Sequence, residues 1–569
     1  MSGRDAAQMR VHVAGGSYSL LLSAARPTAV LEDAAGNRWA DLFLAWSADA
    51  EGQDWTEAIG APVREERDGS VRISLPLEGG RWRAKALLVD CFHDRLELRL
   101  QLRGEGRLSD LHMLGGRYSG SLQLGSGFFR SGAGFDRVFN PEPSRAELWI
   151  RPASASSVID VLGTSAPGSE HWFSTPAPFC YALAQTEPGT WTSLGLAVGP
   201  GINTFTGFHY DALEDSFSLR LAYDGQTAVD GDWTSPALVF RFGAPDPYTA
   251  LELYLLGLEA AGLVPARGRQ EGPSWWARPI FCGWGAQCHL ASLDGGVPTA
   301  FSNQESYDRF LASLKANGLE PGTVVVDDKW QGAYGTADVD RVKWPDLKGW
   351  IAGRHAEGQK VLLWWKAWDS EGLPPELCVR DSGGRPIAAD PSHPAYRALI
   401  GDRLRELLGA DGLDADGLKV DFTARTPSGP GLTRHGPQWG VELLHSLLRT
   451  VYEAAKSAKP DALVMTHTPN PYFRDATDML RLNDVNMERP VVEQMRHRAR
   501  IAELACPDAL IDTDNWPMRD RASWRDYIAV QAELGVPSLY YATHVDTSGE
   551  ELDAGDYAAI ASAWRLARQ

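Results

Sequence analysis

Short stretches of alternating hydrophobic and polar residues fill the first 265 positions of the chain. Val11 to Leu22 and Val71 to Leu77 alternate in this way, and turns such as Glu78-Gly79-Gly80 separate the stretches. Alternation with a period of two is typical of strands that bury one face. The pattern predicts an antiparallel β-sandwich over residues 1–265. We expect this domain to shape or shield a neighbouring site, because its sequence contains no phosphate-binding loop and no metal-ligand spacing.

The pattern changes after a predicted helix at Tyr248 to Leu263 and a linker rich in Arg, Gly and Pro, Pro265 to Pro273. Apolar runs of strand length then alternate with helix-like segments, such as Ser302 to Asn317. This order predicts a (β/α)8 TIM barrel over residues 275–569 and therefore a multidomain chain of β followed by α/β architecture. The eight predicted strands are Ile280–Trp284, Thr323–Asp327, Lys360–Trp365, Gly417–Phe422, Ala462–His467, Met479–Asp484, Ala509–Asp512 and Ser538–Tyr541.

The fourth predicted strand carries two charges inside an apolar run. Leu418, Val420 and Phe422 suit a buried strand, whereas Lys419 and Asp421 do not, because burying a charge without a partner is costly. Barrel enzymes place their chemistry at the carboxyl ends of the strands. Asp421 is thus either a catalytic carboxylate or a structural residue that caps the following loop.

Polar residues also end five other predicted strands, on the face where barrels hold their active sites. Together with Lys419 and Asp421 of strand four, these ends collect at least five carboxylates, two lysines and an arginine at one mouth. The polar ends are Asp327-Asp328, Lys366 after Trp365, Thr466-His467, Arg481 to Asp484 and Asp512 to Asn515.

Composition narrows the choice of partners. The formal charge of −19 argues against nucleic acid and anionic membranes, and no apolar run approaches the ~20 residues of a membrane span. The six cysteines form no C-x-x-C pair, so we expect free thiols, no metal site and no cofactor. The N-terminus lacks the apolar region of a signal peptide, which favours a cytoplasmic protein. The sequence leaves a homo-oligomer open.

Two carboxylates facing each other across a pocket are typical of glycosidic bond cleavage. A retaining enzyme holds them about 5–5.5 Å apart, one as nucleophile and one as acid/base. Asp421 and Asp484, on strands four and six, are the candidate pair. Lys419 and Arg481 would keep Asp421 ionised or bind sugar hydroxyls, and burial would raise the pKa of Asp484. The alternative for Asp484 is a simple ion pair with Arg481.

At these residues the chain resembles the clan D retaining α-glycosidases: α-galactosidase families 27 and 36 and, more distantly, α-glucosidase family 31. The motif D-D-x-W stands at Asp327 to Trp330, and K-x-D stands at Lys419 to Asp421. Trp344 to Lys348 resembles the F-P-x-G-L-K segment before strand three, and an Arg precedes the acid/base as Arg481 precedes Asp484. The resemblance covers roughly residues 280 to 545.

The resemblance implies a role for each matched residue. Asp421 would be the nucleophile and Asp484 the acid/base of an exo-acting, α-galactosidase-like hydrolase. The implied substrate-binding residues are Asp327 and Asp328 at O4 and O6, Lys419 at O3 or O4, Trp284 in the sugar platform and Asp512 in the pocket wall.

Strand three adds two further candidates. Trp365 would stack on a sugar ring, since indole and pyranose faces are both apolar. Lys366 stands where the family more often has an acidic residue, which indicates a substrate with an anionic group. His467 is interpreted either as a hydrogen-bonding residue of the pocket or as a core histidine.

Three readings of the chain remain. The first is a retaining α-glycoside hydrolase acting on an oligosaccharide or glycoside in carbohydrate metabolism. The second is a transglycosylase of the same fold, in which a sugar rather than water accepts the glycosyl group. The third is a non-catalytic carbohydrate-binding protein with a decayed site, motivated by the unusual R-L-N-D-V-N context of Asp484. A metal-dependent hydrolase is disfavoured because no H-x-H follows strand one.

Overall fold

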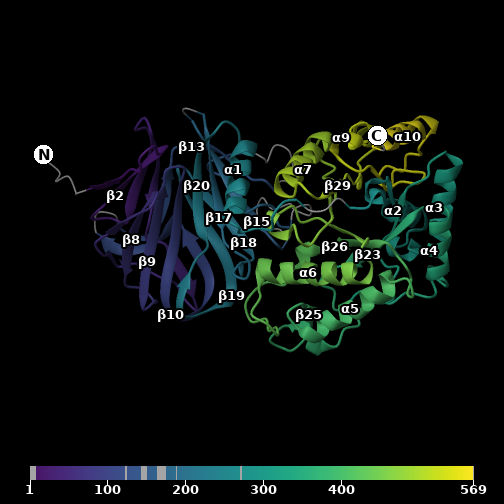
Figure 1. The fold of residues 1–569 in the computed structure, drawn as a ribbon, viewed down its shortest axis with the longest axis horizontal. Helices are drawn as coiled ribbons and strands as arrows, with labels where there is room; N and C mark the ends of the chain where they lie inside the picture. The colour runs from purple at the N-terminus through teal and green to yellow at the C-terminus, as the bar shows by residue number, and fades with distance from the viewer. Residues whose placement is uncertain are drawn as a thin grey trace.

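The computed structural model describes residues 8–121, 125–142, 150–162, 175–186, 189–268 and 272–567. A β-rich part occupies one side of the molecule and a barrel surrounded by helices occupies the other (Figure 1). This is the predicted fold class of a β-sandwich followed by a TIM barrel.

The β-rich part consists of antiparallel strands joined by hydrogen bonds, and helix α1 (Pro247–Ala260) follows them. Its longest strands, β10 and β19, pair with each other along most of their length. The described strands are β1 (Gln8–Val11), β2 (Tyr18–Ser23), β3 (Thr28–Asp33), β4 (Arg38–Phe43), β5 (Ser47–Ala50), β6 (Ala58–Ile59), β7 (Val63–Arg67), β8 (Ser70–Glu78), β9 (Ala84–Phe92), β10 (Arg95–Met113), β11 (Gly115–Ser121), β12 (Gly125–Ala133), β13 (Phe135–Phe139), β14 (Ile150–Pro152), β15 (Ser157–Asp160), β16 (Cys180–Gln185), β17 (Trp191–Ala197), β18 (Gly207–Leu213), β19 (Ser216–Thr234) and β20 (Ala237–Ala244).

The barrel is an eight-stranded parallel sheet in the order β29-β28-β27-β26-β23-β22-β21-β30. A parallel bridge between Asp512 and Val536 brings its two edges together. The strands are β21 (Ile280–Cys282), β22 (Thr323–Val326), β23 (Lys360–Lys366), β26 (Gly417–Asp421), β27 (Leu463–Thr466), β28 (Met479–Arg481), β29 (Leu510–Asp512) and β30 (Ser538–Leu539).

Helices surround this sheet, and a short hairpin, β24 (Cys378–Arg380) with β25 (Pro386–Ala389), is inserted after β23. Residues 529 and 530 divide the helical segment between β29 and β30 into two short helices. The helices are α2 (Trp284–Asp294), α3 (Gln304–Ala316), α4 (Leu347–Ala356), α5 (Pro394–Leu408), α6 (Gly440–Ala458), α7 (Val491–Ala505), α8 (Arg521–Ile528), α9 (Gln531–Leu534) and α10 (Ala554–Leu566). None of the described helices is long and apolar enough to cross a membrane.

Alternate residues of each barrel strand face the barrel interior and the helix layer. On β23, Leu362 packs in the interior cluster, whereas Val361, Leu363 and Trp365 pack in the cluster that includes the helices. The same alternation on β26 sends its apolar residues outward and its Lys and Asp inward. The alternation therefore decides which polar side chains reach the mouth of the barrel.

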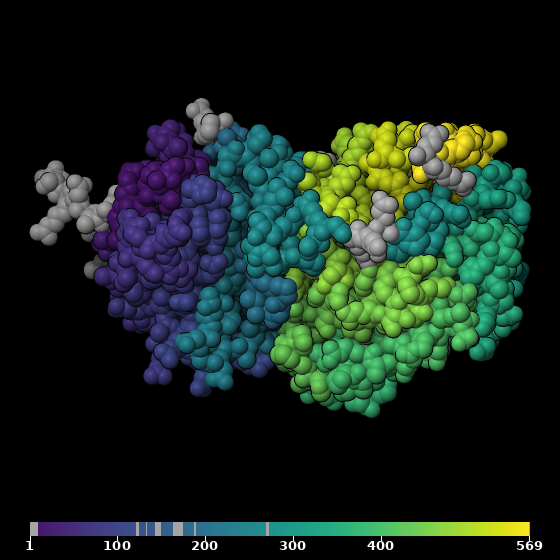
Figure 2. Space-filling view, in the orientation of Figure 1, coloured from purple at the N-terminus to yellow at the C-terminus, as the bar shows by residue number. Residues whose placement is uncertain are grey.

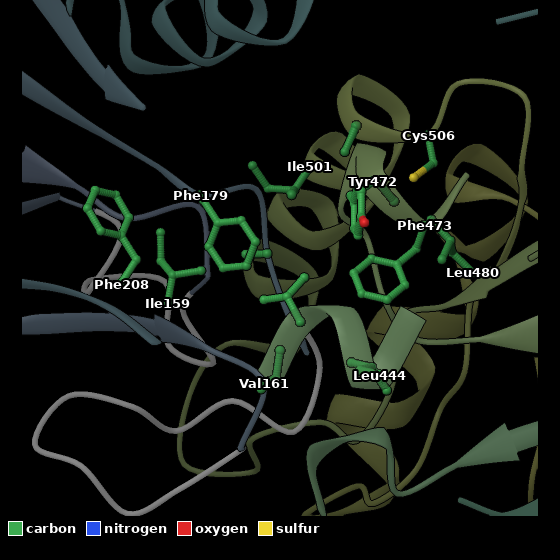
Figure 3. Close-up of a cluster of buried hydrophobic side chains, with 14 of the residues drawn as sticks. Ile159, Val161, Phe179, Phe208, Leu444, Tyr472, Phe473, Leu480, Ile501 and Cys506 are labelled. Atoms are coloured by element: carbon green, nitrogen blue, oxygen red, sulfur yellow. The ribbon is translucent and has the colours of Figure 1, made fainter. Parts of the chain in front are cut away.

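The β-rich part and the barrel pack against each other through apolar side chains. Figure 3 shows Phe179 and Phe208 of the β-rich part and Leu444 and Phe473 of the barrel in one cluster of buried side chains, with Phe179 nearer the barrel than Phe208. The two parts are in contact in the space-filling view as well (Figure 2). Burial of this surface stabilises the arrangement of the two parts, because removing apolar area from water contributes about 25 cal/mol per Å².

Candidate functional site

Asp421 ends β26 at the mouth of the barrel, and four groups surround its carboxylate. The Phe422 backbone N–H donates to Oδ1 at 2.9 Å, and Arg481 donates to the same oxygen at 3.0 Å. Trp364 Nε1 donates to Oδ2 at 3.1 Å, and His467 Nε2 lies 3.5 Å from Oδ1. The side chain is 19% exposed, so it remains within reach of a ligand.

Arg481, at the end of β28, connects three carboxylates through one guanidinium group. Its NH2 donates to Asp421, and its NH1 donates to Asp514 at 2.8 Å and lies 3.4 Å from Asp484. Tyr540 also donates to Asp514, at 3.1 Å. Because one planar group reaches both Asp421 and Asp484, the two predicted catalytic carboxyls lie close together on the same side of the mouth.

The environment moves the pKa values of these two carboxyls in opposite directions. Burial alone would raise the pKa of Asp421, but Arg481 and the other nearby cations lower it well below its usual range. Burial raises the pKa of Asp484 to about 6 against the effect of Arg481, with further increases from Asp421 and Asp514. One carboxyl is therefore ionised while its neighbour holds a proton up to about pH 6.

A buried ion pair forms the base of the mouth. Lys419 Nζ donates to Asp327 Oδ2 at 2.6 Å, and both side chains are only 3% exposed. Cys282 donates to the same oxygen at 3.0 Å, and the Tyr540 ring lies 5.1 Å from the Lys419 ammonium. The charges are paired, so the cost of burying each one is offset.

Asp328 and Lys366 lie higher in the mouth and share the Tyr334 side chain. Tyr334 donates to Asp328 Oδ1 at 2.7 Å, and its ring centroid lies 4.0 Å from Lys366 Nζ. Burial raises the pKa of Asp328 to about 6. Lys366 pairs with Asp369 at 2.8 Å. Neither Tyr334 nor Asp369 ends a predicted strand, so the sequence pattern gave no reason to single them out.

His467 is fully buried behind Asp421. Its Nε2 lies 3.1 Å from Thr423 Oγ1, and its Nδ1 lies 3.4 Å from Thr175 Oγ1 of the β-rich part. The two threonine hydroxyls are 2.7 Å apart. Thr175 is far from Asp421 in the sequence, yet it contacts the two residues behind that carboxylate. No sequence motif pointed to Thr175.

Arg498 of α7 fixes the loop that carries Asp484. Its NH1 donates to the carbonyl oxygens of Leu482, Asn483 and Asp484 at 2.8, 3.0 and 2.8 Å. An arginine in the middle of a helix carries no motif, so the sequence did not indicate this role.

Left-handed backbone follows the carboxyl ends of five barrel strands. Such conformations are unfavourable for residues other than glycine, and they cluster at functional sites. These residues are Lys329 (φ 73°), Trp368 (φ 70°), Phe422 (φ 60°), Asn483 (φ 58°) and Asp514 (φ 39°).

One predicted site residue, Trp365, faces away from this network. Trp365 is 2% exposed and packs toward the helix layer, because it lies on the opposite face of β23 from Trp364. Asp512 lies in register with Arg481 on the inward face of β29 and is buried. It accepts hydrogen bonds from Ser538 and the Asp514 backbone N–H, so it joins β29 to β30. Trp364 donates a hydrogen bond to Asp421, and Asp514 accepts one from Arg481.

Trp284 begins α2 beside the mouth and is partly exposed. Its ring packs edge-on against Trp516, with the ring centroids 5.8 Å apart. Trp516 in turn donates to Asp546 at 3.0 Å. The pair forms an aromatic wall next to the carboxylates.

All six cysteines lie in the described residues and are free thiols. Within the described part of the chain, no group of three or more His, Cys, Asp or Glu residues could hold a metal ion. The charged and titratable groups described at the mouth include carboxylates, one histidine and the cations around them.

No protein-family model and no curated protein sequence matches the chain. Solved structures do match over its whole length. The α-N-acetylgalactosaminidase NagBb from Bifidobacterium bifidum, solved with GalNAc, has a TM-score of 0.65 at 12% identity, covering 99% of this chain and 93% of that one. The fold is that of the clan D α-glycosidases.

Two further structures with this fold come from different glycosidase families. A family 31 sulfoquinovosidase from E. rectale, solved with an aza-sugar inhibitor, has a TM-score of 0.59 at 11% identity over 100% of this chain and 82% of that one. The family 36 α-galactosidase AgaB from Geobacillus stearothermophilus has a TM-score of 0.53 at 11% identity over 100% of this chain and 86% of that one.

Proposed function

We propose that the protein is a retaining, exo-acting α-glycoside hydrolase with Asp421 as nucleophile and Asp484 as general acid/base. The observation that carries the proposal is the pair of carboxyls held by Arg481 with pKa values moved in opposite directions. Such a pair supplies one ionised and one protonated group at the same pH, which is what glycosidic cleavage requires. The fold, shared with solved α-glycosidases, supports the same assignment.

In the first step, an Asp421 oxygen attacks the anomeric carbon of the substrate. The bond to the glycosidic oxygen breaks, and Asp484 gives its proton to that oxygen as the aglycone leaves. Arg481 and the Phe422 N–H keep Asp421 ionised before the attack. The product of this step is a glycosyl ester on Asp421.

In the second step, the Asp484 carboxylate takes a proton from water, and the water oxygen attacks the anomeric carbon. The bond between the sugar and Asp421 breaks, and both carboxyls return to their starting states. Two inversions at the same carbon give net retention of the α configuration.

Sugar hydroxyls would be bound by Asp327 and Lys419 at the base of the mouth and by Asp328 above them. The buried Lys419–Asp327 pair closes the mouth from below, which suits an enzyme that removes a terminal sugar. The neighbouring structures act on different sugars, so a panel of aryl α-glycosides is needed to identify this substrate.

Azide rescue tests the proposed function. We expect Asp421→Ala to retain sugar binding and to lose turnover, and added azide to restore it with formation of a β-glycosyl azide. Asp484→Ala should instead form an α-glycosyl azide from substrates with good leaving groups. Wild-type turnover in Asp421→Ala would refute the proposed mechanism.

A further inference from the structure

Lys366 lies directly opposite Asp421 on the neighbouring strand, yet it does not pair with it. The register of β23 and β26 matches Lys366 with Asp421 at their carboxyl ends. The ammonium instead contacts Asp369 and the ring of Tyr334. An ammonium has three donors, and the Asp369 carboxylate needs only one of them. Lys366 is therefore a cation beside the reacting carboxylate with donors left for a ligand.

Arg425 brings a second cation to the same part of the mouth. It ends the short turn that follows Asp421, and it is exposed. Its guanidinium lies 4.3 Å from the Phe422 ring centroid, and Lys366 Nζ lies 5.5 Å from the same centroid. Within the described residues the Arg425 guanidinium contacts the Phe422 ring and not a carboxylate, although Arg is well suited to bind two oxygens of one anion.

From this arrangement we propose that the substrate carries an anionic group, a carboxylate or a sulfonate, which Lys366 and Arg425 bind beside Asp421. The inference rests on the proposed function and adds the substrate class. Lys366 and Arg425 both contact the Phe422 ring next to Asp421, and an exocyclic carbon that carries such an acid would present two or three oxygens to these cations. Neutral hydroxyls would leave the exposed guanidinium without an anionic partner.

The test compares matched pairs of 4-nitrophenyl α-glycosides. The galactoside is compared with the galacturonide, and the glucoside with the glucuronide and the 6-sulfonate. We expect kcat/KM to be at least tenfold higher for the anionic member of one pair. Either acid confirms the anionic class, and the pair that responds tells carboxylate from sulfonate.

Variants at the two cations make the test specific. Lys366→Met and Arg425→Gln should each lower the ratio of anionic to neutral kcat/KM at least tenfold. Lys315→Met removes an exposed lysine from α3, away from the site residues, and should leave the ratio unchanged. Higher salt should reduce the ratio in the wild type. A preference for the neutral members, or an unchanged ratio in Lys366→Met, would overturn the inference.

A binding measurement separates this inference from the proposed function. Calorimetry on Asp421→Asn with methyl α-galactoside and methyl α-galacturonide, and with the matching gluco pair and its 6-sulfonate, should detect tighter binding of one anionic sugar. If neutral glycosides are hydrolysed with dependence on Asp421 and no anionic sugar is favoured, only the charge inference fails. If no glycoside is hydrolysed but an anionic sugar binds through Lys366, the proposed function fails and the binding inference stands.

Discussion

Arg481 contacts both carboxyls of the proposed catalytic pair and a third carboxylate beside them. Its guanidinium is 3% exposed and donates to Asp421 and Asp514 while lying 3.4 Å from Asp484. Hydrogen bonds in a buried site are stronger than in water, and removing one partner leaves a charge uncompensated. The state of both proposed catalytic carboxyls therefore depends on this one residue.

Replacing Arg481 with Met should lower kcat/KM by about 100- to 1,000-fold. Because Arg481 lowers the pKa of both Asp421 and Asp484, its loss should raise both values and move the pH–rate profile to higher pH. Arg481→Lys keeps a charge but cannot bridge three carboxylates, so it should give a smaller shift and an intermediate rate. A profile unchanged in Arg481→Met would contradict this role.

The pH dependence of the wild type should reflect Asp484. A carboxyl with a pKa of about 6 carries its proton below that pH and loses it above, so kcat/KM should fall as pH rises through about 6. Asp484→Ala should remove this alkaline limb for substrates that need no proton on the leaving group. The measurement is kcat/KM from pH 4 to 9 with aryl glycosides of high and low leaving-group pKa.

Residue patterns alone found Lys419 and Asp421 because a charge stands out within an apolar strand. They could not tell which of Trp364 and Trp365 faces the barrel interior, because two adjacent residues of the same type give no hydrophobic alternation. The strand register makes that choice, and it sends Trp365 to the helix layer. The predicted strand end singled out Asp512 and not Asp514. In the structure, the backbone after β29 places Asp514 where its carboxylate accepts a hydrogen bond from Arg481.

At the scale of elements, helix α6 joins the barrel to the β-rich part through Glu442 in its first turn. Its Oε1 accepts hydrogen bonds from the Gly201 and Asn203 backbone N–H groups at 2.7 and 3.0 Å and from the Tyr472 hydroxyl at 2.6 Å. The carboxylate also lies near the positive end of the helix. One side chain thus satisfies donors from both parts of the molecule.

Glu442→Ala should lower the free energy of unfolding by about 2–4 kcal/mol, because it leaves three donors without their acceptor. Glu453→Ala on the same helix is the control, since that side chain is 62% exposed and should change stability by less than about 0.5 kcal/mol. Urea titrations followed by tryptophan fluorescence measure both. Equal stability of the two variants would show that Glu442 does not hold the parts together.

The order of strands and helices could be predicted from hydrophobic periods, which depend on local burial. Strand ends were less accurate: the fourth and sixth strands stop at Asp421 and Arg481, before the predicted ends at Phe422 and Asp484. Phe422 and Asn483 adopt left-handed backbone there, and nothing in their residue types predicts it. Both departures lie at the proposed site, and functional sites are where local sequence rules are most often broken.

At the scale of the whole molecule, the start of α6 lies against the β-rich part. Gly440 has φ of 55°, and a Cβ at this position would lie 1.9 Å from the Phe205 carbonyl oxygen. We expect Gly440→Ala to destabilise the protein by about 3 kcal/mol or more, since neither backbone can move without loss of packing.

Gly353→Ala is the matched control for this substitution. Gly353 lies inside α4 with open space at its Cβ position, so alanine should stabilise the protein by about 0.5–1 kcal/mol. Thermal unfolding midpoints of the two variants should therefore move in opposite directions. A midpoint for Gly440→Ala at or above the wild-type value would contradict the tight interface.

Contacts between distant parts of the chain were the least predictable feature. The β-rich part was expected to shape or shield the site, but the contact of Thr175 with Thr423 and His467 depends on how two separate folds dock. No local pattern encodes such a contact, because its partners are more than 240 residues apart.

Trapping the glycosyl-enzyme tests the central claim most directly. A 5-fluoro glycosyl fluoride of the preferred sugar slows the second step, so the covalent intermediate should accumulate and be located by mass spectrometry of peptides. The account predicts one added sugar on the peptide containing Asp421, and none in Asp421→Asn. A label on another residue, or turnover with inverted product and no label, would contradict it.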